Sequence, residues 1–178
     1  MENVEKSMSF NRKLKTRDDP CLITKILVGV DGSETSEKAL DCALEIADRF
    51  SASILILNVF QSPPEIGNQL SMIQQSSSPG YSQESIDYQP IIREFRKVHE
   101  AVLSRAAERA NKLKPALKIT AELKEGDPSS QIVETAANGE FDLIVIGHRG
   151  DGQIREFFLG STSERVAHRA TCAVLIAK

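Results

Sequence analysis

Residues 141–150 read Phe-Asp-Leu-Ile-Val-Ile-Gly-His-Arg-Gly, and residues 160–163 read Gly-Ser-Thr-Ser. The apolar run is typical of a strand buried on both faces, and we predict that it ends at Ile146, with a helix following from Ser161 to Ala170. Glycines let a backbone approach a ligand closely, and the first N–H groups of a helix attract anions. The stretch therefore predicts a strand–loop–helix unit that binds a phosphate.

Outward from this unit, apolar runs alternate with amphipathic segments. We predict the other strands near residues 25–30, 53–60, 117–123 and 172–177, the third of them half exposed at a sheet edge. We predict the other helices near residues 35–50, 90–114 and 128–137, the last with Asp127 as its cap. This alternation predicts an α/β fold with a parallel sheet, helices on both faces and ligands at the carboxyl ends of the strands.

The helix near residues 90–114 carries apolar residues at helical spacing. We predict that five of them face the sheet: Ile92, Phe95, Val98, Val102 and Ala106. His99 lies beside this stripe, where we predict a partly exposed structural histidine.

Two segments differ from the rest in composition. Residues 1–21 carry mixed charges with few apolar residues, and we predict a disordered tail there. Residues 61–89 are rich in Ser, Gln and Pro, which indicates a flexible insertion in a single domain of residues 22–178.

The composition argues against several classes of protein. A net charge of −3 and a pI near 5.7 disfavour a nucleic-acid binder. No apolar run reaches the roughly 18–20 residues of a membrane span. Three scattered cysteines form neither a disulfide framework nor a redox pair, so we predict a reduced, cytoplasmic protein.

The glycine loop matches neither common phosphate-binding motif. No G-x-x-x-x-G-K-[ST] motif is present, and Gly150-Asp-Gly152 is followed by Arg155 where a dinucleotide fold has its third glycine. The pattern that remains is G-x-x-G-x9-G-S.

This pattern, together with Ile26-Leu-Val-Gly-Val-Asp-Gly-Ser33 and Cys172-Ala-Val-Leu-Ile176, resembles the ATP-binding branch of the universal stress protein family. The resemblance covers residues 23–178 except for the insertion. It implies a doubly wound, five-stranded parallel sheet of strand order 3-2-1-4-5, Rossmann-like and similar to the adenine nucleotide alpha-hydrolases. It also implies binding of ATP, ADP or AMP with magnesium.

The resemblance further implies which residues touch the nucleotide. Val30, Val59 and Ile146 would surround the adenine, Asp31 would lie near the ribose and a phosphate-bound magnesium ion, and Gly147 would approach the ribose. The phosphates would be held by Gly150, Gly160, Ser161, Thr162 and Ser163. Asp31 has a purely structural alternative as the cap of the first helix.

Three functions are compatible with these residues. The leading hypothesis is a small ATP-binding regulatory protein in a stress response, a homodimer through Ala173–Ala177, whose edge strand needs cover. The first alternative is a slow ATPase or autophosphorylating enzyme, for which the sequence offers no identifiable catalytic residue. The second is a scaffold with a vestigial site, in which residues 61–89 bind an unknown protein partner.

Overall fold

A computed structural model describes residues 22–61, 89–148 and 159–178. The predicted tail and most of the predicted insertion lie outside these residues, and Gln89 is the first residue of a helix. The strands are β1 (Lys25–Gly29), β2 (Ser53–Phe60), β3 (Ile119–Glu125), β4 (Leu143–Gly147) and β5 (Ala173–Ala177). The helices are α1 (Glu34–Phe50), α3 (Gln89–Leu113), α4 (Pro128–Asn138) and α5 (Ser161–Arg169).

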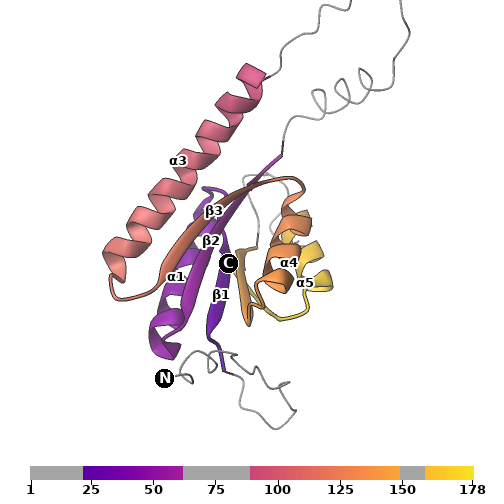
Figure 1. The fold of residues 1–178 in the computed structure, drawn as a ribbon. Helices are drawn as coiled ribbons and strands as arrows, with labels where there is room; N and C mark the ends of the chain where they lie inside the picture. The colour runs from indigo at the N-terminus through magenta and orange to yellow at the C-terminus, as the bar shows by residue number, and fades with distance from the viewer. Residues whose placement is uncertain (1–21, 62–88, 149–158) are drawn as a thin grey trace, which may run out of the picture.

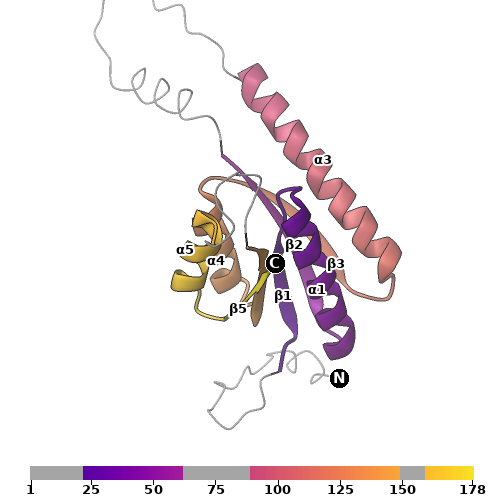
Figure 2. The same cartoon turned by 180° about the vertical axis from the view of Figure 1, so that it is seen from behind.

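All five strands are parallel, in the order β3-β2-β1-β4-β5. Figures 1 and 2 show α1 and α3 on one face of the sheet and α4 and α5 on the other. The predicted α/β class, strand order and edge position of β3 are therefore confirmed. The strand order reverses between β1 and β4, which makes the carboxyl ends of these two strands the switch point where ligands of such folds bind.

The alternation of side chains along the strands divides the core into two clusters. Ile26, Val28 and Val30 face α1 and α3, whereas Leu27 belongs to the cluster under α4 and α5. The stripe predicted on α1 is buried against the first cluster through Leu40, Ala43, Leu44 and Ala47.

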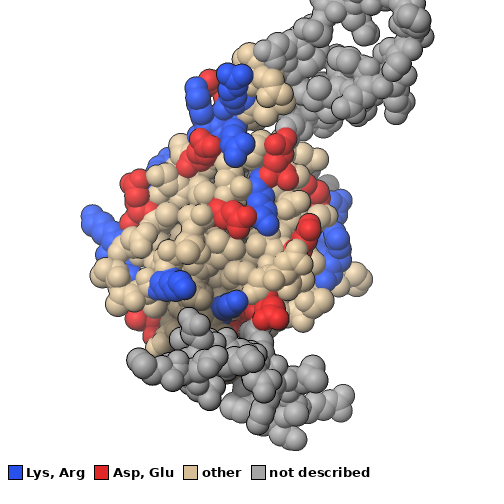
Figure 3. Space-filling view, viewed as in Figure 1, with Lys and Arg blue, Asp and Glu red and all other residues tan. Residues whose placement is uncertain are grey.

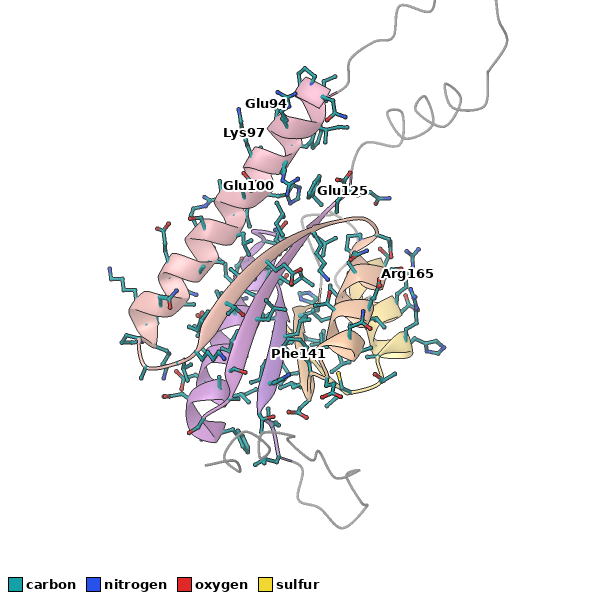
Figure 4. The ribbon with its side chains drawn as sticks, viewed as in Figure 1. Glu94, Lys97, Glu100, Glu125, Phe141 and Arg165 are labelled. Carbon is teal, nitrogen blue, oxygen red and sulfur yellow. The ribbon has the colours of Figure 1, made fainter. Side chains whose placement is uncertain are left out.

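Ion pairs attach the carboxyl-terminal half of helix α3 to α1. There Arg109 pairs with Asp41 of α1, and Lys114, just after α3, pairs with both Glu45 and Asp48. The amino-terminal half extends past the sheet, with Glu94 and Lys97 near its free end (Figure 4).

The predicted inward stripe of α3 is wrong at Phe95 and Val98, whereas Ile92 is half-buried. Phe95 is 43% exposed and Val98 is 63% exposed, because no sheet lies beneath that part of the helix. Val102 and Ala106, further along, are half-buried as predicted.

The surface of the described residues is mixed in charge. On the face shown in Figure 3, basic and acidic side chains are interspersed. None of the helices in the described part of the chain is long and apolar enough to cross a membrane.

Candidate functional site

The carboxyl ends of β1 and β4 lie side by side. Val28 pairs with Val145, so Val30 and Gly147, two residues further, lie level at the edge of the sheet. Glu125 marks the same edge at the end of β3 (Figure 4). This edge brings the β1–α1 turn next to the predicted glycine loop.

The β1–α1 turn is organised by Asp31. Its Oδ1 atom accepts hydrogen bonds from the backbone N–H and the hydroxyl of Ser33. Ser33 in turn caps α1 by accepting from the N–H of Ser36 at 3.2 Å. The structural alternative for Asp31, a helix cap, is thus wrong in detail, since Asp31 positions the residue that does the capping. The Oδ2 atom of Asp31, an exposed residue, has no hydrogen-bond partner among the described residues.

Gly147 has a structural role that the sequence did not reveal. A Cβ atom at this position would lie 2.7 Å from Thr35 Oγ1, 2.8 Å from the Thr35 carbonyl carbon and 3.0 Å from the Ser36 nitrogen. These distances are shorter than van der Waals contact, so glycine is required for β4 to pack against the start of α1. Approach to a ribose is not needed to explain this glycine.

The two ends of the glycine loop are tied together at the sheet. The His148 carbonyl accepts a hydrogen bond from the Gly160 N–H at 2.8 Å and lies 2.9 Å from the Ser163 hydroxyl. Ser163 is 3% exposed, and its hydroxyl also lies 2.9 Å from the Gly160 carbonyl. The Ser163 hydroxyl has one proton, and the carbonyls of His148 and Gly160 are its acceptors. It is therefore not a phosphate donor. The sequence-based role of the Ser163 hydroxyl therefore needs revision, while its backbone N–H is unaffected.

The three helices that begin at or near the carboxyl edge differ at their first turns. Ser33 caps α1 and Asp127 caps α4 with their side chains, whereas the cap residue of α5 is Gly160, which has no side chain. The N–H groups of Ser161, Thr162 and Ser163 have no acceptor among the described residues, as the first turn of a helix dictates. Unpaired N–H groups of this kind, at the positive end of a helix dipole, attract anions.

The predicted adenine-contacting residues lie on opposite faces of the sheet. Val59 and Ile146 both pack in the cluster under α4 and α5. Val30 is buried in the cluster under α1 and α3, and its N–H continues the sheet to Leu57. The side chains of Val59 and Ile146 could therefore contact the same ligand. Val30 could reach that ligand only through its backbone.

Sequence reasoning missed a buried hydrogen-bond chain beneath this edge. Asn58 is 0% exposed, and its Nδ2 atom donates to the Val30 carbonyl at 2.8 Å. Its Oδ1 atom lies 2.8 Å from Nδ1 of His99 on α3. Because an amide oxygen only accepts, Nδ1 of His99 carries the hydrogen. An asparagine inside an otherwise apolar strand was the signal that could have revealed this chain.

The environment of His99 favours its neutral form. Burial lowers the pKa of the imidazole, and the nearby Asp31 carboxylate opposes this effect in part. The ring also packs against Phe60, with ring centroids 5.7 Å apart. His99 therefore ties α3 to the turn that carries Asp31.

Gly150 and a metal site are the two remaining predicted features. Gly150 lies outside the described residues. Across residues 22–61, 89–148 and 159–178, no three or more His, Cys, Asp or Glu side chains gather as a metal site would require.

The fold and this edge define a doubly wound, Rossmann-like α/β domain whose switch point carries a glycine loop and an open helix start. The chain belongs to the universal stress protein family, which matches residues 23–178.

Known proteins resemble the chain over most of its length. Universal stress protein YxiE of Bacillus subtilis (strain 168) is 31% identical over 158 residues, which are 88% of this chain and 100% of that protein. The solved structure of UspA from Lactobacillus plantarum has a TM-score of 0.67 at 24% identity and covers 87% of this chain and 97% of its own. A universal stress protein solved in complex with cAMP has a TM-score of 0.58 at 27% identity, covering 87% and 96%.

Proposed function

We propose that the chain is a regulatory module that binds ATP, or ADP or AMP, in a stress response. The phosphates lie at the start of α5, on the N–H groups of Ser161, Thr162 and Ser163. The base lies over Val59 and Ile146, and Gly150 and Gly160, which carry no side chain, leave room for the phosphates at their own positions.

The observation that carries this proposal is the uncapped start of α5. Gly160 has no capping side chain, whereas α1 and α4 are closed by Ser33 and Asp127. The Gly160 N–H donates one hydrogen bond to the His148 carbonyl, and the Ser163 hydroxyl lies 2.9 Å from the same oxygen, so the start of α5 is held beside the end of β4. Backbone N–H groups held there bind phosphate without any basic side chain.

The relatives favour an adenine nucleotide. The 27% identical universal stress protein was solved with cAMP, which contains both an adenine and a phosphate. We extend the adenine nucleotide class to this chain and choose ATP because the motif G-x-x-G-x9-G-S is complete in its sequence.

We assign Asp31 to the cation rather than to the nucleotide itself. A carboxylate repels a triphosphate unless a cation lies between them. Asp31 uses Oδ1 to hold Ser33, which leaves Oδ2 for a magnesium ion brought by the phosphates. Asp31→Asn should therefore weaken binding of ATP with magnesium far more than binding of AMP.

Calorimetric titration of the full chain with adenosine, AMP and ATP tests the proposal. Affinity should rise with the number of phosphates, and magnesium should strengthen only the ATP complex. Equal affinity for adenosine and ATP, or no heat with any of them at millimolar concentration, would refute nucleotide binding at α5. Phosphate release in the same samples tests the enzyme alternative, because a robust rate lost in Asp31→Asn would overturn a binding-only role.

We further propose a homodimer through β5 and a cytoplasmic location. Among the strands of residues 22–61, 89–148 and 159–178, β5 lies at an edge of the sheet, and edge strands can pair with a second copy. Cys42 and Cys172 are free thiols, which suits a reducing compartment.

A further inference from the structure

A pocket of about 290 Å³ opens between α1 and α3. It forms one turn above the ion pair of Arg109 with Asp41, where α3 begins to diverge from the domain. Its lining residues come from the end of β1, the β1–α1 turn and the two helices: Val30, Gly32, Ser36, Glu37, Leu40, Val102, Arg105, Ala106 and Arg109.

This pocket is separate from the proposed nucleotide site. Val30 and Leu40, which line it, belong to the core cluster under α1 and α3. Val59 and Ile146, which we assign to the base, pack on the opposite face of the sheet. The pocket and the side chains that we assign to the base therefore lie on opposite faces of the sheet, although Gly32 in the pocket is next to Asp31, which we assign to the cation. Binding in the pocket does not depend on nucleotide binding.

The two arginines of the pocket differ in what they can still bind. Arg109 is neutralised by Asp41 through two contacts of 2.6 and 2.9 Å, and this partner raises the pKa of its guanidinium. Arg105 donates from Nε to the Ala101 carbonyl at 3.3 Å, and its terminal nitrogens have no partner among the described residues. A free guanidinium edge matches the two oxygens of a carboxylate.

We propose that this pocket binds a small molecule with one carboxylate on an apolar body. The carboxylate pairs with Arg105, and the apolar body lies against Val30, Leu40, Val102 and Ala106. The volume of about 290 Å³ is just below the range of about 300–1,000 Å³ that is common for small-molecule sites, so the ligand must be small.

Glu37 sets the charge of the ligand. Its carboxylate lines the same pocket and already interacts with Arg109 across it. A second negative charge on the ligand would face this carboxylate without a free cation to compensate. The pocket thus selects a monoanion and disfavours polyphosphates, including the nucleotide proposed for the other face.

A matched pair of probes tests the inference: 4-phenylbutyrate and its neutral amide, 4-phenylbutanamide. Each is titrated into the ¹⁵N-labelled full chain and followed through backbone amide shifts. We expect the acid to bind about tenfold more tightly than the amide and to shift Gly32 and Val102 but not Val59 or Ile146.

Two variants on α3 distinguish binding in the pocket from unspecific attraction between the acid and basic side chains. Arg105→Gln should abolish the preference for the acid, and Arg93→Gln, an exposed arginine outside the pocket, should retain it. Ala106→Leu, which fills the pocket, should weaken both probes. Because Ala106→Leu could also disturb the core, Arg105→Gln is the deciding variant.

Three results would overturn the inference. Equal affinity for acid and amide would remove the role of Arg105, and equal losses in the Arg93 and Arg105 variants would show unspecific attraction. Amide shifts confined to Ile91, Phe95 and Val98 would show that the probe merely coats the exposed half of α3.

Discussion

Gly147 shows how one residue serves the architecture of the site. A methyl group there would collide with Thr35 and with the backbone nitrogen of Ser36. We expect Gly147→Ala to lower the free energy of unfolding by about 1–3 kcal/mol, the usual cost of overpacking, as measured by urea denaturation. Thr35→Ala in the same chain removes only the Oγ1 contact and should restore part of the loss. Unchanged stability of Gly147→Ala would contradict the packing role.

His99 predicts a pH dependence of stability. Its pKa in the folded protein lies below the ordinary value of 6.5, so the unfolded chain binds more protons between the two values. Stability must therefore rise with pH across that window, be complete above about 6.5, and be lost as pH falls through the folded pKa. Thermal melts of His99→Gln should show a flatter pH profile between pH 7 and 5.

The matched control is His168→Gln, since His168 is exposed near the end of α5. This variant should keep the profile of the unmodified protein. If His99→Gln keeps that profile as well, burial does not lower the pKa of His99.

For single residues, the sequence identified important positions correctly but did not predict the contacts that these residues make. The glycine pattern singled out Gly147, but its contact is the start of α1, which lies far away in sequence. Similarly, Asp31 was weighed as a cap because spacing alone cannot show that its carboxylate holds Ser33. Such roles depend on side-chain directions set by the folded turn.

At the scale of elements, the start of α4 has a measurable energetic role. Asp127 accepts from the Ser129 hydroxyl and the Ser130 N–H, which together lower the pKa of its carboxyl. Asp127→Ala should lower the free energy of unfolding by about 1 kcal/mol, the usual cost of losing a cap. Chemical denaturation at neutral pH measures it.

The Asp127 cap also predicts that the stability of the folded protein decreases at acidic pH. Since the folded pKa of Asp127 lies below 3.8, its stabilisation is present above that value and is lost as pH falls through the folded pKa. The difference between wild type and Asp127→Ala should shrink in that range. A difference that stays constant down to low pH would show that the charge of Asp127 does not contribute.

Helices and strands were predicted well because their signals are local. The bounds of β2 follow its apolar run, α1 follows its apolar stripe, and the start of α4 follows Asp127-Pro128. The inward face of α3 was predicted wrongly for Phe95 and Val98, because periodicity identifies an apolar stripe without showing how far the sheet extends beneath it.

At the scale of the whole molecule, the exposed edge at β5 predicts the assembly. Ala173 is exposed at the start of this edge strand, and a lysine there opposes pairing with a second copy. We expect the unmodified chain to sediment as a dimer and Ala173→Lys to sediment as a monomer with an unchanged circular dichroism spectrum. A monomeric unmodified chain, or a dimeric variant, would rule out this interface.

The strand order followed from resemblance, and the parallel sheet followed from the alternation of strands and helices. Which of the predicted adenine-contacting side chains lies on which face of the sheet was not predictable. It depends on the register of β1, β2 and β4, which places Val30 on one side and Val59 with Ile146 on the other.

We propose the uncapped start of α5 as the phosphate site, and the Gly160→Asp variant tests this assignment. Gly160 has φ −66° and ψ 152°, a conformation that aspartate adopts readily at a cap. Its carboxylate would occupy the first-turn N–H groups and repel phosphate, so the melting temperature should be maintained or rise while calorimetry shows ATP affinity falling more than about tenfold. Gly160→Asn, a cap without charge, should lose less affinity. A folded Gly160→Asp variant that binds ATP as tightly as the unmodified chain would contradict the account.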